Sequence, residues 1–310
     1  MIDYTIIIPH KNIPSLLQRC LDSIPLREDV QVVVVDDNSD VELVDFSHFP
    51  KWRGNHFECY FTKEGKGAGY ARNVGLEHAK GKWLVFADAD DYFLPEVSDV
   101  FNDEIDTEAE IVFYRPKFVL NDDLEISSKR GGSEYNRYID VFFETGSEMG
   151  LRTRWLSPWS KLIKKSLVDQ KHFRFEETKF SNDVMFSVLT GCESAKVVAR
   201  DLGFYVVTER EGSLTSHFCK KAGELDIRAS VFFKAQKVVN KFGFPVDDRL
   251  AVLFLRRLFS ENRDMFKTDF KILQDLSSCS RLELIRSIFE ANSLLSRVKR
   301  GVYTYFMTLS

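Results

Sequence analysis

The sequence has few of the features that mark secreted, disulfide-bonded or membrane-spanning proteins. Its 5 cysteines are odd in number, and no pair has the spacing of zinc ligands. Free thiols in a reducing cytoplasm are therefore the expected state. No apolar run approaches the roughly 18 residues that span a bilayer. The opening MIDYTIIIPHK has neither a basic start nor an apolar stretch long enough for a signal peptide, so we expect a cytoplasmic protein.

Positive charge is not in excess either, which bears on the partners of the protein. Lys and Arg number 43 against 47 Asp and Glu, a net charge of −4. Nucleic-acid-binding domains carry a basic surface, so no nucleic acid is expected as a partner. Hydrophobic residues make up 44% and charged residues 29% of the chain, which is typical of a globular protein. A length of 310 residues accommodates one large domain or a domain with an appendage.

The first hundred residues contain a regular alternation of apolar runs and amphipathic segments. The runs YTIIIP, VQVVVV, HFECYFT and KWLVFA predict buried strands. The segment PSLLQRCLDSI and residues 71–79 have helical spacing, and Gly81 closes the second helix. Strands that alternate with helices predict an α/β fold, with a mainly parallel, Rossmann-like sheet and helices on both faces.

The rest of the chain has a less regular pattern. Residues 109–120 predict a strand interrupted by a proline, and residues 121–136 a polar, exposed loop. Residues 157–168, SPWSKLIKKSLV, predict a turn that leads into a helix, and residues 195–209 two short strands. From about residue 220 the pattern is helical with few glycines, so we expect a C-terminal helical appendage.

Polar or glycine-rich segments follow each of the four predicted N-terminal strands. Each segment alone is compatible with an ordinary turn or loop. However, ligands of open parallel sheets bind beyond the carboxyl ends of the strands, and all four segments are expected at that edge. The common edge therefore predicts a binding site. The segments are Pro9–Lys11, Asp36–Asn38, Gly65–Gly69 and Asp88–Asp91.

The acidic cluster of Asp88, Asp90 and Asp91 indicates a cation. Packed carboxylates repel one another, and Mg²⁺ or Mn²⁺ typically binds one or two carboxylates together with phosphate oxygens. Asp88 and Asp90 alternate along the chain and point to the same side, so one carboxylate is expected to take the metal and the other a ribose hydroxyl. Asp37 suits a hydrogen bond from a base N–H such as that of uracil, and Arg72 a contact with the base or phosphate.

A family resemblance extends this interpretation. In order and spacing, TIIIPHKN…LLQRCLDSI, VVVVDDNSD, GAGYARNVGL and FADADDYFLPE resemble the nucleotide-binding half of family-two inverting glycosyltransferases with the glycosyltransferase-A fold. The segments SPWSKLIKKSLV, FSNDVMFS and REGSLTSHF resemble the acceptor side of that family. The resemblance covers roughly residues 3–217. It implies a catalytic domain over residues 1–217, with a nucleotide-sugar-binding half (1–100) and an acceptor-side half (101–217), before a helical region (218–310).

The resemblance also implies an activity and roles for single residues. The expected enzyme is a metal-dependent, inverting, hexosyltransferase-type glycosyltransferase that moves a sugar from a UDP-sugar to a hydroxyl of a glycan or lipid-linked acceptor in polysaccharide assembly. By this resemblance Asp37 reads the uracil, Asp88 holds the ribose, and Asp90 ligates Mn²⁺ or Mg²⁺. Asp183 is the catalytic base. The expected nucleotide-sugar-binding residues are Pro9, Asp37, Gly67, Arg72, Asp88 and Asp90.

Several residues keep two interpretations. Two of them depart from the family pattern: Lys11 stands where an aromatic residue commonly stacks on the base, and Asn182 stands where a Glu is usual. Asp183 suits a helix cap as well as a catalytic base. Trp155 and Trp159 suit either a sugar platform or the core.

Two further residues and one basic segment also have two interpretations. Lys161 is expected in solvent rather than at the diphosphate. His217 is compatible with a metal or phosphate contact, although a lone loop histidine usually has neither role. The basic segment 296–306 suits a solvated helix end, or peripheral contact with the inner face of an anionic membrane.

Two rival functions remain from the residues alone. A phospho-acceptor signalling module also has an acidic magnesium pocket at parallel strand ends, but it would leave Gly65–Asn73 without a role. A non-catalytic carbohydrate-binding protein on a decayed transferase is disfavoured by the intact set of Asp37, Asp88, Asp90 and Asp183.

Overall fold

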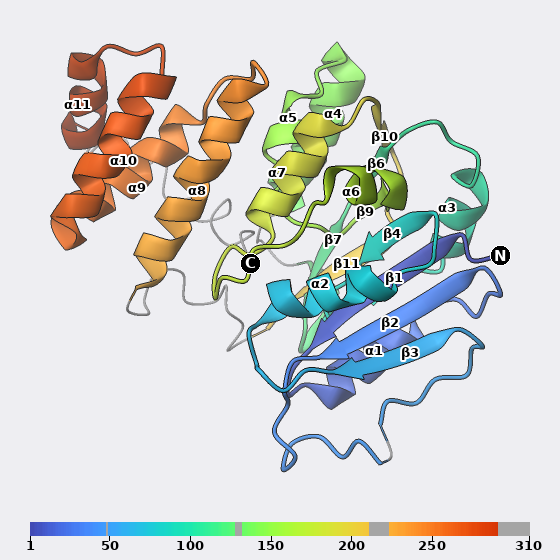
Figure 1. The fold of residues 1–310 in the computed structure, drawn as a ribbon. Helices are drawn as coiled ribbons and strands as arrows, with labels where there is room; N and C mark the ends of the chain where they lie inside the picture. The colour runs from blue at the N-terminus through green and yellow to red at the C-terminus, as the bar shows by residue number, and fades with distance from the viewer. Residues whose placement is uncertain (48, 128–131, 211–222, 291–310) are drawn as a thin grey trace.

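The computed structural model describes residues 1–47, 49–127, 132–210 and 223–290 (Figure 1). A seven-stranded sheet in the order β10-β6-β9-β4-β1-β2-β3 forms its centre, and a four-stranded sheet in the order β5-β11-β7-β8 lies beside it. The α/β prediction with a mainly parallel sheet is therefore confirmed.

The four predicted N-terminal strands form one parallel half of the large sheet. They are β1 (Tyr4–His10), β2 (Val30–Asp36), β3 (Phe57–Phe61) and β4 (Trp83–Phe86). All residues of β1 and β2 are buried, because helices cover both faces of the sheet. The right-handed crossover from β1 to β2 contains α1 (Pro14–Asp22). The crossover from β3 to β4 runs the other way across the sheet and contains α2 (Ala68–His78), so the two helices lie on opposite faces (Figure 1).

Helix α2 begins three residues before the predicted start, inside the predicted glycine loop. The sequence predicts Gly69 as part of a loop, but it lies in the first turn of α2. In the structure Gly69 is needed for close approach, since a Cβ there would lie 2.1 Å from the carbonyl oxygen of Glu176. Gly67 supplies the turn, with φ at +97°, a value that side chains rarely adopt.

The other half of the large sheet contains a strand that the sequence did not reveal. β6 (Ile111–Tyr114) and β10 (Val197–Arg200) are parallel to each other, but β9 (Lys161–Lys164) runs antiparallel between β4 and β6. The prediction of a turn into a helix over residues 157–168 is therefore wrong at its centre, and α6 (Lys165–Lys171) begins only after the strand. Because β9 is antiparallel, its first residue lies at the edge where β4 and β6 end.

The small sheet corrects a second prediction. It contains β5 (Tyr92–Phe93), β7 (Lys117–Leu120), β8 (Asp123–Ser127) and β11 (Tyr205–Glu209). The exposed loop predicted over residues 121–136 in fact includes β8 and the start of a helix. The sequence of β8, DLEIS, alternates polar and apolar residues over only five positions within a polar, turn-rich segment, and all five residues are exposed. The alternation is therefore too short to separate a strand from the surrounding loop. The helices of this half are α3 (Val97–Asp103), α4 (Gly132–Thr145), α5 (Met149–Thr153) and α7 (Val184–Glu193).

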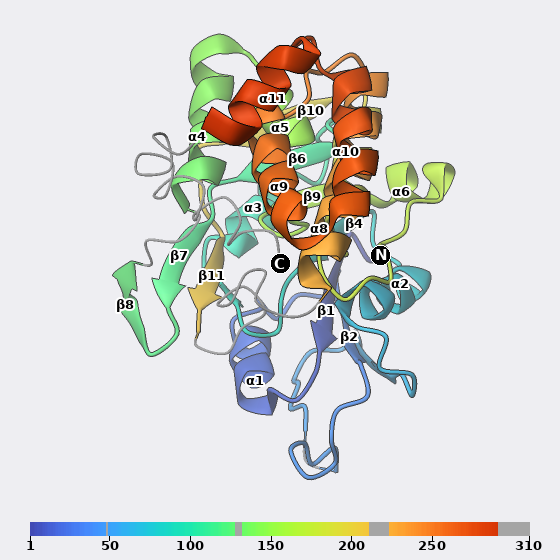
Figure 2. The same cartoon turned by 90° about the vertical axis from the view of Figure 1, so that its left-hand side faces the viewer.

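The C-terminal helices form the predicted appendage, which faces the viewer in Figure 2. They share a hydrophobic cluster with α7, in which Val184 and Val188 contact the same core as Phe232 and Leu255. Within the described chain, no helix combines the length and hydropathy needed to cross a membrane. The domain boundary predicted after residue 217 lies outside the described residues. The helices are α8 (Glu224–Lys241), α9 (Asp248–Glu261), α10 (Arg263–Leu276) and α11 (Arg281–Glu290).

Candidate functional site

The carboxyl ends of β1, β2 and β4 meet at one edge of the sheet, as the sequence predicted. Pro9 is buried in β1 and pairs in register with Val35, and the next pair is His10 with Asp36. Burial opposes ionisation of Asp36, but hydrogen bonds from His10 (2.7 Å) and Ser39 prevail and hold its pKa below the usual value. Asp36 therefore serves the fold, and the next residue faces the site.

Asp37 ties the glycine segment to the strand ends. Its Oδ2 accepts a hydrogen bond from the backbone N–H of Gly67 at 2.8 Å, and its Oδ1 accepts one from Thr62 at 3.2 Å. The Nζ of Lys11 lies 3.7 Å from Oδ2 and donates to the backbone carbonyl of Asp37. A Cβ on Gly67 would meet no atom of the described residues within 4 Å, so this part of the structure leaves open space beside the loop.

The three carboxylates after β4 have different environments. Asp91 is buried and accepts hydrogen bonds from the hydroxyl of Tyr205 (2.7 Å) and the backbone N–H of Thr208 (2.8 Å). Burial, with the neighbouring charges of Asp90 and Asp88, raises the pKa of Asp91 well above its usual value. Asp91 therefore fastens the loop to β11, whereas the side chains of Asp88 and Asp90 remain 25% and 21% exposed.

Arg72 links the donor-side edge to the segment of Asp183. It lies buried on α2, where NH2 contacts Asp88 Oδ1 at 2.5 Å and NH1 donates to Asn182 Oδ1 at 2.9 Å. Burial raises the pKa of Asp88, although the charge of Arg72 opposes the shift. One guanidinium thus joins Asp88 to Asn182, which are 94 residues apart in the sequence.

Asp90 forms an ion pair with an arginine side chain in the structure. Its Oδ2 lies 2.7 Å from Nε of Arg210. Among the described residues, no three His, Cys, Asp or Glu side chains are grouped so that they could hold a metal ion by themselves. A magnesium or manganese ion that shares a diphosphate needs only one or two carboxylates. The partly exposed Asp90, which already pairs with a positive charge, fits that requirement.

Asp183 is the most unusual carboxylate of the site. It stands at the N-cap of α7, is 0% exposed, and makes no capping hydrogen bond, so the helix-cap interpretation is wrong. Among the described residues, neither of its carboxylate oxygens has a hydrogen-bond partner. Burial raises its pKa to about 6, while Arg72 and Arg228 act in the opposite direction and Asp88 adds to the rise. An unpaired buried carboxylate with such a pKa is well suited to accept a proton near neutral pH.

Other interpretations are corrected by the burial of their side chains. Trp155 and Trp159 are 1% and 3% exposed and pack around Tyr135, so neither forms a sugar platform. Lys161, expected in solvent, is only 1% exposed. The residue His217 and the basic segment 296–306 lie outside the described residues.

Two arginines lie beside the site although no sequence pattern predicts them there. Arg228 on α8 is buried, donates to Ser181 at 3.2 Å and pairs with Glu224. A Glu and an Arg four residues apart on a helix are usually a surface pair, so the pattern gave no reason to place it near Asp183. Arg210 followed a predicted strand, and only the structure brings it to Asp90.

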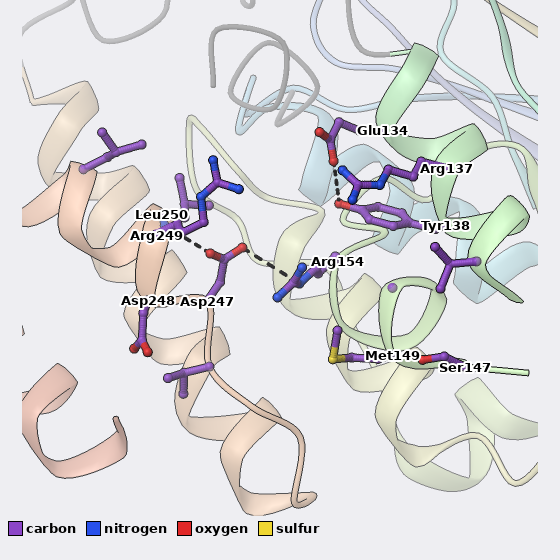
Figure 3. A pocket seen from close by; sticks show the side chains of 14 residues that line it. Glu134, Arg137, Tyr138, Ser147, Met149, Arg154, Asp247, Asp248, Arg249 and Leu250 are labelled. Atoms are coloured by element: carbon purple, nitrogen blue, oxygen red, sulfur yellow. Dashed lines mark hydrogen bonds and ion pairs between the residues drawn. The ribbon is translucent and has the colours of Figure 1, made fainter. Parts of the chain in front are cut away.

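A cavity of about 480 Å³ lies apart from these residues, between α4, α5 and the start of α9 (Figure 3). Asp247 caps α9 through the N–H of Leu250 and lies 3.9 Å from Arg154 across the cavity. Arg152 of α5 donates to the carbonyl of Gly191, in the last turn of α7, and to that of Ser194, its C-cap. The cavity therefore lies toward the end of α7 opposite Asp183, and none of the predicted site residues lines it.

Comparisons with known proteins agree with the fold. A family model described as Glycosyl transferase family 2 matches residues 5–175, more than half of the chain. The glycosyltransferase GlyA of Streptococcus pneumoniae is 26% identical over 261 residues, which are 80% of this chain and 36% of that protein.

The second relative is the poly(ribitol-phosphate) β-N-acetylglucosaminyltransferase TarS of Staphylococcus aureus, 26% identical over 68% of this chain and 36% of that protein. The chain thus spans about a third of the length of these relatives. A structure of TarS with UDP-GlcNAc superimposes with a TM-score of 0.63 at 19% identity, covering 99% of this chain and 89% of that one. The mannosyltransferase PcManGT of Pyrobaculum calidifontis, with GDP-Man and Mn²⁺, gives 0.58 at 14% identity, covering 99% and 85%.

Proposed function

Because this chain belongs to glycosyl transferase family 2 and has the glycosyltransferase-A fold, we propose that it is an inverting transferase that moves a sugar from a UDP-sugar to an acceptor hydroxyl. One observation carries the proposal. A fully buried carboxylate, Asp183, lies without a hydrogen-bond partner in the described structure and is linked through Asn182 and Arg72 to the acidic edge of the sheet.

The donor is proposed to bind at the ends of β1, β2 and β4, within residues 1–100. Asp37 lies beside open space at Gly67 and suits the base, and Asp88 keeps an exposed fraction that suits the ribose. Pro9, Gly67 and Arg72 lie at the same edge and complete the proposed set of nucleotide-sugar-binding residues. The UDP-GlcNAc in the similar TarS structure supports a uridine nucleotide as the carrier.

The metal is proposed to bind Asp90. When bound, Mn²⁺ or Mg²⁺ supplies positive charge to the departing diphosphate. The carboxylate of Asp90 suits this ion by its donor chemistry and exposure, and the Mn²⁺ bound to PcManGT supports the choice of metal. Arg210 pairs with the same oxygen in the structure, so it is expected to leave Asp90 when the ion binds.

The base is proposed to be Asp183, acting from the acceptor-side half over residues 101–217. In an inverting displacement the acceptor hydroxyl attacks the anomeric carbon as the base removes its proton, and no covalent enzyme intermediate forms. Arg72 and Arg228 favour the ionised form of Asp183 and so keep it able to take that proton.

The acceptor is proposed to be a polyhydroxylated polymer under assembly. The poly(ribitol-phosphate) named for TarS supports polymers that carry phosphate, and glycans or lipid-linked glycans remain within the class. The family match extends through residue 175 and so disfavours the signalling module. Cytoplasmic location, the division at residue 217 and membrane contact stay predictions.

A panel of UDP-sugars with Mn²⁺ tests this function by the release of UDP in the presence of candidate polymers. We expect one donor to be turned over, and Asp183→Asn to lower the rate of UDP release by roughly 10²–10⁴ while UDP still binds. If UDP binds in calorimetry but no donor is hydrolysed or transferred with any acceptor tested, the non-catalytic alternative replaces the proposal.

A further inference from the structure

Lys161 reaches the site because β9 runs against its neighbours. Phe113 near the end of β6 pairs with Lys161, and Val85 near the end of β4 pairs with Leu162. The first residue of β9 therefore lies at the carboxyl edge of the parallel strands, the edge that also carries Asp88. The strand that the sequence did not reveal thus brings a lysine to the side of the sheet where ligands bind.

The backbone before Lys161 is held in an uncommon conformation. Ser160 has a φ of +56°, which is unusual for a residue other than glycine. Its hydroxyl donates to the carbonyl of Tyr114 at 3.0 Å, and its own carbonyl accepts the N–H of Tyr114. The segment before Asp183 has the same feature, with φ at +55° for Ser181. Both turns are buried, and each one fixes the start of the element that carries an ionisable side chain.

The lysine is in an unfavourable environment unless it has a charged partner. Its side chain is 1% exposed, and Nζ lies 5.4 Å from the centre of the Phe113 ring. An ammonium group removed from water is costly in free energy. Burial lowers the pKa of Lys161 to about 7, and the charge of Asp183 opposes the shift.

Charged side chains on four parts of the chain lie near Asp183 and influence its ionisation. Arg72 of α2, Asp88 after β4 and Arg228 of α8 influence its ionisation. Lys161 lies at the same place, because Phe86, the residue after Val85 on β4, packs 5.4 Å from the ring of Phe186, one turn after Asp183 on α7. The charge of Asp183 opposes the fall in the pKa of Lys161. Arg72 and Arg228 have acidic partners of their own, Asp88 and Glu224. The attraction between two charges is mutual, so an ammonium that Asp183 stabilises must also stabilise the carboxylate.

We propose that Lys161 is a positioning residue of the transferase site, whose buried ammonium group keeps the carboxylate of Asp183 ionised and therefore able to take the acceptor proton. The proposal rests on the proposed function and extends it to a residue that touches neither donor nor acceptor. The proton balance is simple: Asp183 gains the acceptor proton, and Lys161 keeps its own.

The pH dependence follows from the two groups. Asp183 is ionised above about pH 6, and Lys161 carries its charge below about pH 7. The ammonium therefore matters most on the acid side of neutrality, where the carboxylate would otherwise take up a proton. Above about pH 8 Asp183 is ionised with or without Lys161, and the influence of the lysine on turnover disappears.

The test compares Lys161→Met with Lys164→Met, a matched change on the same strand at a half-buried lysine outside the site. Both are assayed for kcat at saturating UDP-sugar and acceptor between pH 5.5 and 8.5. On the acid side of the profile of kcat against pH, the rise in activity (the acid limb) should move to higher pH by about one unit or more in Lys161→Met. At pH 6 kcat should fall by about fivefold or more, while at pH 8.5 it stays within about threefold of wild type and UDP affinity is unchanged. Lys164→Met should leave the limb in place.

A purely structural role would lower kcat of Lys161→Met equally at every pH. An acid limb that stays in its wild-type position overturns the proposal. Lys161→Arg, which keeps the charge, should keep the wild-type limb if it folds.

A second measurement needs neither turnover nor a folded Lys161 variant. The pKa of the Lys161 ammonium is followed directly by NMR of side-chain-labelled lysine in wild type and in Asp183→Asn. If Asp183 stabilises the ammonium, removal of its charge should lower the pKa of Lys161 further. An unchanged pKa of Lys161 would refute the pairing. If no UDP-sugar is turned over but this pKa falls, the charge pair stands and the proposed function falls.

Discussion

The donor-side and acceptor-side carboxylates of this chain are held in opposite ways. Asp37, Asp88 and Asp90 each have a hydrogen-bonding or charged partner in the structure, and Asp88 and Asp90 are partly exposed. Asp183 is buried and has no hydrogen-bond partner among the described residues. A carboxylate that accepts hydrogen bonds or forms a close ion pair is fixed in place for binding. A carboxylate that has no hydrogen bond and feels only nearby charges is free to change its protonation state. The difference separates residues that hold a ligand from the residue that reacts.

The largest expected effect comes from removing the unpaired carboxylate. Asp183→Asn keeps the shape but cannot take a proton, so kcat should fall by roughly 10²–10⁴, the usual range for a general base. UDP affinity should stay near wild type, and so should thermal stability at pH 8, where Lys161 has lost its proton and is not left as an unpaired buried charge. Steady-state kinetics, calorimetry and thermal unfolding measure the three quantities. Turnover within tenfold of wild type would remove Asp183 from the role of base.

A smaller effect is expected where the carboxylate binds the ion. UDP binding should strengthen with Mn²⁺ or Mg²⁺, and Asp90→Ala should remove this dependence, because the proposed carboxylate ligand of the ion is lost. Glu125→Ala, at an exposed position of β8, is the control for loss of one negative charge. Calorimetry that gives equal UDP affinity with chelator and with metal would contradict the metal assignment.

The smallest expected effect belongs to Asp37, which has both a structural and a binding role. Asp37→Ala should weaken UDP binding by about 1–3 kcal/mol, the cost of a lost hydrogen bond to a charged group. Thr62→Val removes only the 3.2 Å bond to Asp37 and serves as the control for loosening of the loop. If the two variants bind UDP equally well, Asp37 acts on the loop and not on the base.

The two halves also differ in how well the sequence predicts them. The strands of the first half are buried on both faces, so they appear as continuous apolar runs, and the polar residues that follow them mark the edge of the site. These local patterns were enough to predict the parallel sheet and to bring Asp37, Asp88 and Asp90 together.

The second half depends on contacts between distant segments. β9 begins and ends with lysine, and its burial comes from its place between β4 and β6, which no local pattern reveals. The burial of Lys161 and the arrival of Arg228 from α8 have the same origin. Asp183 was identified through the family resemblance, and its lack of partners became visible only in the folded chain.

The pH dependence of wild-type kcat tests the central claim most directly, because it reports the ionisation of the base. It is measured at saturating donor and acceptor from pH 5 to 8, beside the Asp183→Asn variant. Burial raises the pKa of Asp183 to about 6. Activity should therefore be low below about pH 6 and rise above it as the carboxylate loses its proton, and this limb should be absent from the residual activity of Asp183→Asn. An acid limb that remains unchanged in Asp183→Asn would show that another group is the base.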